Sequence, residues 1–400
     1  MKAVVLAAGE GKRMFPFTEI RPKAMLPVAN KPIAEHLLIE LCQAGIEEVL
    51  FVVGYRSETI RDYFGDGSKW SISVQYATQK NQLGTADAVR QISCWAEGRF
   101  ILVNGDVVLG RSHIREIMQS HDPVMCLYPQ TDVSGLGVVE MHGSRVSRIH
   151  EKVDNPPSNL VNTGVYLLTP EIFPAIERTK LSKRGEYELT DSLQLLIDQG
   201  VLVNGHKVRD WLNFTYPWDL LKANEMLMTT LKPDVGGEIE PGAHVKGPLC
   251  LGVGSVIRAG SYIVGPVIIG DNCEIGPNCY VRPCTAIGDR CHVGASVEIK
   301  NSILMSGAKV PHHNYVGDSI IGERCNLGAG TKAANLRLDH ENIHSMGADT
   351  GRKKLGALVG DEVQVGINAS IDAGCAIGSY SVIGPGALVR GMVLPRSTIM

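Results

Sequence analysis

An aliphatic residue returns at every sixth position through much of the second half of the chain, and this repeat is the feature that most constrains the fold. The phased positions, many of them followed by glycine, are Ile239, Val245, Leu251, Ile257, Ile263, Ile269, Ile275, Val281, Ile287, Val293, Ile299 and Met305. Repeats of this length form solenoids in which each short strand buries one aliphatic side chain and stacked coils pair the backbone. We therefore predict a parallel β-helix of hexapeptide repeats.

The repeat is interrupted twice. After Met305 the next phased residue is Ile321, sixteen residues later and four more than two repeats, so a loop is expected near Pro311–Tyr315. A longer excursion is expected at Asn335–Leu355, after which the repeat resumes. Loops that leave a rigid scaffold often carry function, although the corners of solenoids also accept neutral insertions. The first break is of special interest because it contains His312 beside a second histidine.

The first half of the chain alternates between buried strands and amphipathic helices. Strands are predicted at Lys2–Leu6, Val49–Val53, Phe100–Val103, Val124–Leu127 and Leu160–Leu167, and helices at Ile33–Ala44, Asp191–Asp198 and Trp218–Leu231. This order predicts an α/β domain, Rossmann-like with a mainly parallel sheet covered on both faces. Pro233 and Gly236–Gly237 mark the predicted boundary between a first domain, residues 1–232, and a second, residues 233–400.

Two strand ends in the first half carry chemical signals. The sequence AAGEGKRM follows Leu6, and glycines there let backbone N–H groups approach a phosphate, with Arg13 and Lys23 adding positive charge. The loop lacks the third glycine of a dinucleotide fingerprint and the GK[ST] of a P-loop, which disfavours both activities. After Val103 comes Asn-Gly-Asp, which places Asp106 at the rim of the sheet as a Mg²⁺ ligand or, alternatively, as a turn former.

Composition removes several classes of function. The net charge is −3 with 20% charged residues, which argues against a broad nucleic-acid or membrane surface. The chain has ten cysteines but no Cys-x-x-Cys pair, which disfavours zinc and thioredoxin-like chemistry. Five of them follow an aliphatic repeat position by four residues and are interpreted as core fillers: Cys273, Cys279, Cys291, Cys325 and Cys375. We found no membrane span or signal peptide, so we expect a cytoplasmic protein.

A series of motifs runs through the whole chain. In the first half these are LAAGEGKRM, RPKAMLP, QKNQLGTADA, VNGD, HEK, VNTGVY and WLN, and in this order they resemble sugar-1-phosphate nucleotidylyltransferases. In the second half RPCTAIGDRCHVGASVEIKNS, KVPHHNYVGD and NLGAGTKAAN resemble the acetyltransferase domain of the bifunctional glucosamine-1-phosphate N-acetyltransferase and N-acetylglucosamine-1-phosphate uridylyltransferase family, especially archaeal members. The resemblance implies Mg²⁺ as cofactor, UTP and acetyl-CoA as co-substrates, and a left-handed β-helix.

The resemblance also implies roles for residues of the first half. The nucleoside triphosphate is held by catalytic Lys23 and Arg13 with the glycine loop, and its base and ribose by Gln79, Gly84 and Thr85. The loop residues concerned are Leu6, Ala8, Gly9 and Gly11. The sugar-binding positions are Gly137, Glu151 and Asn162. Asp106 and Asn213 match the metal ligands, although many relatives have aspartate at the second position, so this contact is neutral here.

For the second half the resemblance implies that His312 is the general base of acetyl transfer, with His313 as its rival. Three faces and 18 residues per coil are also implied, so Lys246, Val264, Arg282 and Lys300 should stack at about 4.8 Å as one outward column. Arg282 and Lys300 would then place two cations together, either for a sugar phosphate or as ordinary solvated charges. The remaining implied contacts are Tyr315, Asn326 and Asn335 for the sugar phosphate and reacting groups, and Ala329 for acetyl-CoA.

Three functions remain open from the sequence. The first is a homotrimeric bifunctional enzyme that acetylates glucosamine 1-phosphate and then couples the product to UTP. The second keeps only nucleotidyl transfer, to glucose 1-phosphate with dTTP or UTP, and uses the β-helix for trimer assembly. The third is a regulatory or assembly protein with a degenerate nucleotide fold, which the intact Lys23, Asp106 and glycine loop disfavour.

Overall fold

The structure is a computed structural model that describes residues 1–133, 135–151 and 156–400. The chain forms two compact units, and each is described by itself. The first unit contains Met1–Glu10, Arg21–Met25 and Pro32–Asn213. The second contains Gly11–Ile20, Leu26–Lys31 and Phe214–Met400.

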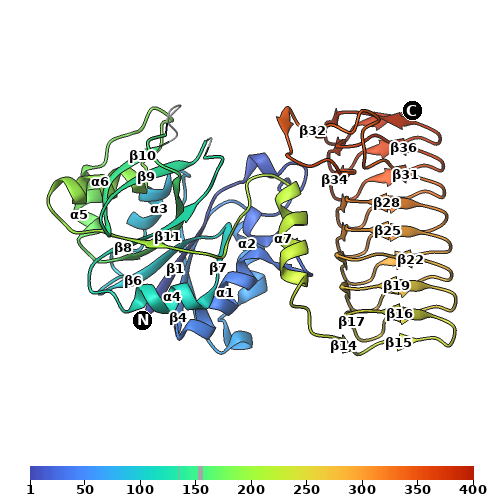
Figure 1. Ribbon diagram of the computed structural model, residues 1–400, viewed down its shortest axis with the longest axis horizontal. Coiled ribbons are helices and arrows are strands. Elements are labelled where there is room, and N and C mark those ends of the chain that lie inside the picture. Colours follow the sequence, from blue (N-terminus) through green and yellow to red (C-terminus); the bar gives the residue numbers. More distant parts are fainter. Residues whose placement is uncertain (134, 152–155) are drawn as a thin grey trace. The chain divides into compact units, whose positions relative to one another are not determined.

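A nine-stranded sheet is the centre of the first unit (Figure 1). In spatial order its strands are β5 (Ser73–Thr78), β4 (Glu48–Val53), β1 (Lys2–Ala7), β6 (Phe100–Asn104), β11 (Leu160–Leu168), β8 (Val124–Pro129), β12 (Asn204–Lys207), β10 (Arg145–Glu151) and β9 (Gly137–His142). The strands from β5 to β6 are parallel, as is the β12–β8 pair, and the other pairings are antiparallel. The sheet is therefore parallel around β1 and mixed beyond β6.

Helices cover both faces of this sheet, as the α/β pattern predicted. One hydrophobic cluster takes Ala3 and Val5 of β1, and the other takes Val4 between them, because successive strand residues point to opposite faces. The first cluster is closed by α1 (Ile33–Ala44), α2 (Ser57–Phe64) and α4 (Arg111–Met118), and the second by α3 (Thr85–Arg90), α5 (Ile172–Arg178) and α6 (Leu189–Asp198). The predicted strands and helices of this half are confirmed to within a few residues at each end.

Three sheets form the faces of a parallel β-helix in the second unit, and its coils stack as a ladder (Figure 1). The first sheet has β14 (Asp234–Val235), β17 (Leu249–Leu251), β20 (Val267–Ile269), β23 (Thr285–Ile287), β26 (Ile303–Leu304), β29 (Ile320–Ile321), β34 (Leu358–Val359), β37 (Ala376–Ile377) and β40 (Met392–Val393). The second has β15 (Glu238–Ile239), β18 (Val256–Ile257), β21 (Glu274–Ile275), β24 (His292–Val293), β27 (Lys309–Val310), β30 (Asn326–Leu327), β35 (Gln364–Val365), β38 (Val382–Ile383) and β41 (Thr398–Ile399). The third has β16 (His244–Lys246), β19 (Tyr262–Val264), β22 (Tyr280–Val281), β25 (Glu298–Lys300), β28 (Tyr315–Gly317), β31 (Lys332–Ala333), β36 (Ser370–Ile371) and β39 (Leu388–Val389).

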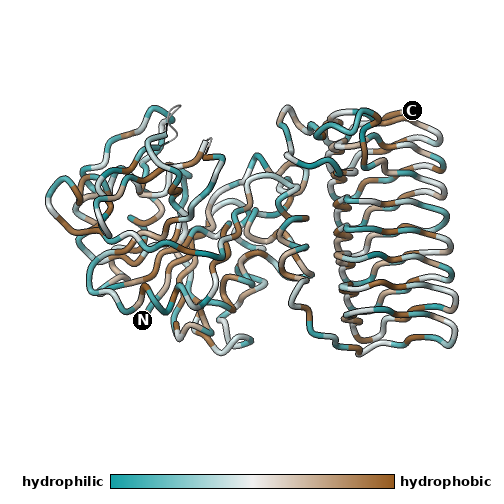
Figure 2. Tube along the Cα trace, in the orientation of Figure 1, coloured by the Kyte–Doolittle hydropathy of each residue, from teal (hydrophilic) through white to brown (hydrophobic). Residues whose placement is uncertain are grey.

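From Leu251 onward the repeat residues make a continuous apolar core inside the coils, whereas Ile239 and Val245 in the first coil are exposed. Each buried Ile or Val contributes about 1.5–3 kcal/mol through removal from water, and polar residues return between the apolar ones along each coil (Figure 2). The five cysteines interpreted as core fillers are all buried free thiols. Cys273 and Cys291 stack in adjacent coils, with the Cys291 N–H donating to the Cys273 sulfur at 3.4 Å.

The expected loop at Pro311–Tyr315 is wrong. In the first coils of the helix, paired residues are 18 apart, as for Tyr262 and Tyr280, but Glu298 pairs with Tyr315, 17 residues later. The chain therefore loses one residue in each of two coils instead of gaining four in a loop. Counting aliphatic residues could not separate these possibilities, because Leu304 fills the core position that the repeat assigned to Met305.

The second excursion is confirmed. Ile320 pairs with Leu358, which is 38 residues later, so the chain leaves the coil between β31 and β34. The excursion contains a short antiparallel pair, β32 (His344–Ser345) and β33 (Ala348–Asp349), and is closed by an isolated bridge between Leu336 and Lys354. The second unit also contains α7 (Trp218–Met228), whose buried Asn224 donates to the Cys284 carbonyl at 2.8 Å.

Candidate active sites

The ends of β1 and β6 form the base of the first candidate site. The N–H of Gly105 donates to the Leu6 carbonyl at 2.8 Å, and a Cβ on Gly105 would lie 2.8 Å from the same oxygen. Glycine is required at position 105 because the ends of β1 and β6 approach each other so closely. Ala8 is held by a hydrogen bond from the Tyr55 N–H to its carbonyl, 3.0 Å, whereas the space around Gly9 is open. The glycine loop therefore begins on a fixed support with an uncovered backbone.

Lys23 and Asp106 meet at this support. The Lys23 ammonium lies 2.6 Å from Oδ2 of Asp106, and the Lys23 side chain is 14% exposed, compared with 35% for Asp106. Sequence reasoning placed both residues near phosphate but did not predict that they pair. The antiparallel ribbon of β7 (Val107–Leu109) and β13 (Trp211–Asn213) places Asn213 opposite Val107, directly after Asp106 in the sequence. The two predicted metal ligands are thus neighbours, and their oxygen atoms are the donor type that Mg²⁺ prefers.

The residues predicted to face the base and ribose surround the start of α3. Gln79 is buried, and its amide nitrogen donates to the Gly84 carbonyl at 3.1 Å and to Asp87 at 2.8 Å. A Cβ on Gly84 would lie 2.5 Å from the Tyr187 carbonyl, so this position also requires glycine. The Thr85 hydroxyl accepts the N–H of Leu189 at 2.9 Å, so it fixes the first turn of α6. These residues therefore shape the loop that leads into α3.

The three predicted sugar-binding residues come together on the antiparallel strands. Gly137 pairs with Glu151, and a Cβ on Gly137 would lie 3.1 Å from a Glu151 oxygen and 3.9 Å from Asn162 Cβ. Lys152 of the HEK motif lies outside the described residues. Glu151 is also contacted by residues that sequence reasoning missed: Arg184 at 3.4 Å and the Thr190 hydroxyl at 3.5 Å.

Tyr166 is another missed residue of this group. Its hydroxyl accepts a hydrogen bond from the Asn162 side-chain amide at 2.6 Å, and burial raises the pKa of the phenol above its usual value. The phenol therefore stays neutral and holds the Asn162 amide in one orientation. Tyr166 is the last residue of the quoted VNTGVY motif, so the motif itself was the available signal.

Gly11 and Arg13 belong to the second unit and are described with it. Gly11 has φ 72° and precedes a short 3₁₀ turn, Lys12–Met14, and its carbonyl accepts the Thr18 hydroxyl at 3.0 Å. The exposed Arg13 guanidinium lies 6.0 Å from the centre of the Tyr216 ring. The arginine is therefore held by a cation–π contact at the edge of its range.

The third sheet of the β-helix carries the second candidate site. Lys246 pairs with Val264 as predicted, which confirms the first step of the outward column. The two cations further along do not form a bare positive surface, because each has an acidic partner. Arg282 lies 2.9 Å from Glu298, and Lys300 lies 2.8 Å from Asp318.

Tyr315 and Asn335 close over Gly317 at this site. A Cβ on Gly317 would lie 2.5 Å from the Tyr315 hydroxyl and 2.7 Å from the Asn335 amide nitrogen. Burial raises the pKa of Tyr315, as do the nearby charges of Glu298 and Asp318. The phenol is therefore neutral near pH 7 and remains a hydrogen-bond donor.

His312 lies at the corner between β27 and β28, with its side chain exposed. Its carbonyl accepts the N–H of Gly330 at 2.8 Å, which places Ala329, the predicted acetyl-CoA contact, in the adjacent coil. Asn326 is on β30 of the second sheet and pairs with Lys309. His313 has φ 52° and its N–H donates to the Ala295 carbonyl, so its backbone is fixed at the corner. The structure therefore groups Ala329 with the His312 corner, and Lys300 and Tyr315 with the third sheet, whereas the predicted contact Asn326 lies apart from these two on the second sheet.

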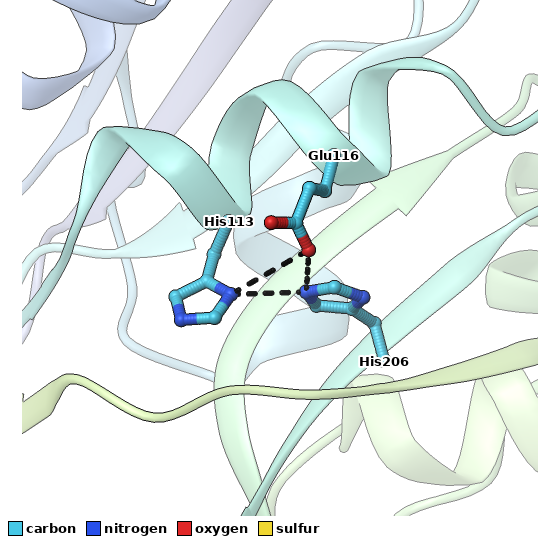
Figure 3. A group of neighbouring side chains, drawn as sticks. All are labelled: His113, Glu116 and His206. Carbon is cyan, nitrogen blue, oxygen red and sulfur yellow. Dashed lines mark hydrogen bonds and ion pairs between the residues drawn. The ribbon is translucent and has the colours of Figure 1, made fainter.

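A third polar cluster, His113, Glu116 and His206, has spacings that suit a metal ion (Figure 3). Nδ1 of His113 is 3.1 Å from Nε2 of His206, which is 3.4 Å from Glu116. However, the Arg209 N–H donates to Nε2 of His113 at 3.1 Å, so the proton of the neutral ring is on Nδ1. A metal ion would need the lone pair of that same Nδ1. We therefore assign the cluster as a hydrogen-bonded histidine pair rather than a metal centre.

Comparison with known proteins gives family matches for both halves of the chain. Residues 2–229 match the nucleotidyl transferase family, residues 263–367 the GMPPB C-terminal domain, and residues 356–391 six bacterial transferase hexapeptide repeats. A solved structure of a putative glucose-1-phosphate thymidylyltransferase from Bacillus anthracis, in complex with a sucrose, matches with a TM-score of 0.53 and 26% identity. The match covers 56% of this chain and 94% of that one.

Relatives match along nearly the full length. A bifunctional protein GlmU from Methanococcus maripaludis strain C7 is 43% identical over 100% of this chain and 97% of the relative. A second, from strain S2 of the same species, is 40% identical over 97% of this chain and 94% of the relative. A bifunctional sugar-1-phosphate nucleotidylyltransferase/acetyltransferase from Sulfurisphaera tokodaii is 36% identical over 98% and 97%.

The fold and the two sites define an enzyme that joins a nucleotidyltransferase α/β domain to a left-handed β-helix of the hexapeptide acetyltransferase type. Within this class, the chain belongs to the family of bifunctional GlmU proteins. Among the residues that the structure describes, no helix combines the length and the apolar character needed to cross a bilayer.

Proposed function

We propose that this enzyme transfers an acetyl group from acetyl-CoA to glucosamine 1-phosphate and then transfers a uridylyl group from UTP to the product, releasing pyrophosphate. The observation that carries the proposal is the grouping of Lys300, Tyr315 and Asn335 on one face of the β-helix, in the coils around His312. A β-helix that served only as a scaffold would not need this polar group.

The first site suits nucleotidyl transfer. The sugar phosphate attacks the α-phosphorus of the nucleotide and pyrophosphate leaves, a reaction that needs positioning and charge neutralisation rather than a covalent nucleophile. Lys23 and Arg13 would neutralise the phosphates, and the open backbone at Gly9 would donate N–H groups. Asp106 and Asn213 would hold Mg²⁺, which when bound polarises phosphate oxygens. Glu151 and Asn162 would accept and donate hydrogen bonds to the sugar hydroxyls.

The second site suits acetyl transfer. The amine nitrogen adds to the thioester carbonyl, the C–S bond breaks, and an imidazole nitrogen of His312 takes the amine proton and passes it to the departing thiolate. Arg282 and Lys300 would hold the sugar phosphate. Lys300 keeps this capacity although it pairs with Asp318, because an ammonium has three N–H donors. Ala329 and Asn326 would line the thioester side.

We further propose the functional division at residues 1–232 and 233–400, with the family match ending at residue 229 as support. We also propose a homotrimer, since flat β-helix faces can pair around a closed symmetry axis. The exposed ring pair of Tyr262 and Tyr280, with centres 6.0 Å apart, supports such a contact, and light scattering measures it directly. UTP and acetyl-CoA are cytoplasmic metabolites, so we place the enzyme in the cytoplasm.

A second function is favoured by the match to a putative glucose-1-phosphate thymidylyltransferase. In that case the first site would use glucose 1-phosphate with dTTP or UTP, and the β-helix would only assemble the oligomer. The two functions differ in whether acetyl-CoA is consumed.

One experiment separates them. Thiol release from acetyl-CoA with glucosamine 1-phosphate is measured in the intact protein and in His312→Ala, and pyrophosphate release from UTP with N-acetylglucosamine 1-phosphate is followed in parallel. Loss of a general base should lower thiol release by about 10²–10⁴-fold and leave pyrophosphate release unchanged. His313→Ala is the matched control at the neighbouring position. No thiol release by the intact protein with any amino sugar phosphate would leave the second function.

A further inference from the structure

Asp318 is a buried carboxylate at the centre of the second site, and sequence reasoning assigned it no role. Its side chain is 3% exposed. Oδ2 accepts hydrogen bonds from the Lys300 ammonium at 2.8 Å and the Asn335 amide nitrogen at 2.6 Å. Oδ1 accepts the Asn301 amide nitrogen at 2.8 Å. Burying a charge is costly unless it is well paired, and here three donors from two chain segments, Lys300–Asn301 and Asn335, satisfy it.

The carboxylate fixes which way the Asn335 amide faces. A carboxylate only accepts hydrogen bonds, so the NH₂ of Asn335 must face Asp318 and its carbonyl oxygen must face away. The same NH₂ lies beside the Tyr315 hydroxyl over Gly317. The atom of the Asn335 amide that remains is its oxygen, which accepts hydrogen bonds. It can therefore bind the N–H groups of an incoming amine but not the carbonyl oxygen of another group.

The carboxylate also fixes Lys300. Its pair with Asp318 holds one N–H of the ammonium, so the other two point in defined directions. An amino sugar phosphate needs both functions together, a cation for the phosphate and an acceptor for the amine. Asp318 is the one side chain that accepts hydrogen bonds from both Lys300 and Asn335 among the residues that the structure describes.

We propose that Asp318 is a positioning residue of the acetyl-transfer site: it sets the amide orientation of Asn335 and the direction of Lys300, and so selects an amine-bearing sugar phosphate. This inference rests on the proposed acetyl transfer. Asp318 acts through its neighbours and does not itself touch the substrate.

A second layer of contacts holds Asp318 in place. Asn301 donates from the same nitrogen to Asp318 and to Glu225 of α7, each at 2.8 Å, and Arg352 of the excursion also donates to Glu225 at 2.7 Å. The Asn301 amide thus links two ion pairs, Lys300 with Asp318 and Arg352 with Glu225. Both N–H groups of Asn301 are committed to acids, and its buried Oδ1 has no hydrogen-bond partner among the described residues.

The test starts from Asp318→Asn, which keeps the size of the side chain. Asp318 has φ 50°, a left-handed conformation that asparagine also adopts readily, so the backbone has no reason to change. The new amide presents a donor where donors already converge, and Asn335 would have to turn its own NH₂ toward the substrate. We expect kcat/KM for glucosamine 1-phosphate to fall by about 10- to 100-fold, with KM for acetyl-CoA and pyrophosphate release unchanged.

The double variant Asp318→Asn/Asn335→Asp restores the pattern. The amide introduced at position 318 would donate a hydrogen bond to the carboxylate introduced at position 335. This carboxylate would present an acceptor oxygen to the substrate, and it would also serve as the acidic partner of Lys300. We expect the double variant to recover most of the activity that Asp318→Asn loses. A double variant that folds normally but is no better than Asp318→Asn overturns the proposal, as does an Asp318→Asn enzyme with full acetyl-transfer activity.

Asp271→Asn is the matched control, since Asp271 is a corner carboxylate of the same β-helix that accepts the Val253 N–H at 2.8 Å. It should leave kcat/KM for the amino sugar unchanged, and an equal loss there would mean that any corner substitution is harmful and would overturn the proposal. If the intact protein releases no thiol, the proposed function fails separately. Calorimetric binding of glucosamine 1-phosphate alone then decides: unchanged affinity in Asp318→Asn overturns the role of Asp318.

Discussion

Each candidate site is built on a lysine–aspartate pair, and the two pairs differ in burial. Lys23 and Asp106 are 2.6 Å apart, with an aspartate side chain that is 35% exposed. Lys300 and Asp318 are 2.8 Å apart, with an aspartate that is 3% exposed and held by three donors. The distance is nearly the same, so distance does not separate their roles.

Burial separates them. A partly exposed carboxylate can exchange its lysine for a metal ion or for water at little cost, because the solvent compensates the charge. A buried carboxylate that loses a partner is left uncompensated, which is strongly unfavourable. Asp106 is therefore suited to bind and release a ligand, whereas Asp318 is suited to keep other side chains in place. The comparison therefore predicts that replacement of aspartate by asparagine has different effects at positions 106 and 318.

Among the substitutions that test this comparison, Asp106→Asn is expected to have the largest effect. Removal of this charge should lower pyrophosphate release by about 10²–10³-fold and raise the Mg²⁺ concentration needed for half-maximal rate. Thiol release should be unchanged, the reverse of the pattern for Asp318→Asn. Titration of Mg²⁺ in both assays measures this, and loss of both activities would show instead that the substitution damages the fold.

An intermediate effect is expected for Arg282→Ala. Arg282 pairs with Glu298 but remains 36% exposed, so it resembles Asp106 more than Asp318 in its freedom to take a ligand. We expect KM for glucosamine 1-phosphate to rise by about 5- to 10-fold with little change in kcat. Steady-state kinetics measure the split, and a fall in kcat with unchanged KM would contradict a phosphate-binding role. Arg258→Ala is the matched control, because Arg258 pairs with Glu240 at 2.7 Å in an earlier coil.

The smallest effect is expected for His206, which extends the comparison to a polar group outside both sites. Burial lowers the pKa of His206, with neighbouring His113 acting in the same direction and Glu116 opposing it. The unfolded chain therefore binds the proton more readily, so the free energy of unfolding is largest above pH 6.5 and falls as the pH drops below this value.

His206→Gln should make the melting temperature less dependent on pH between about 5 and 7. Thermal unfolding at a series of pH values measures the slope, and equal slopes in both proteins would contradict the assignment. Added Zn²⁺ should not raise the melting temperature of the wild type relative to the variant. The Arg209 N–H occupies the Nε2 lone pair of His113, so the ring proton is on Nδ1, the atom that would have to bind the metal ion.

Much of the fold was predictable because it rests on periodic burial. The six-residue repeat specified the β-helix, and the run Ile33–Ala44 specified its helix to the residue. The predicted loop at Pro311–Tyr315 failed because Leu304 and Met305 are both apolar, and the repeat alone does not say which of them faces the core. The mixed half of the sheet was also missed, since strand direction depends on partners that are distant in sequence.

The sequence by itself determined the solenoid, the order of the α/β elements and the positions of Lys23, Asp106, Lys300 and His312, because these follow from local periodicity and from motifs that are contiguous in the chain. Only the tertiary structure decided which charges meet. Asp318 reaches Lys300 and Asn335 because successive coils stack at about 4.8 Å, and a loss of one residue in a coil changes which side chains stack. Burial and hydrogen-bond direction arise from that stacking, so the roles of the two lysine–aspartate pairs became distinguishable only in the folded protein.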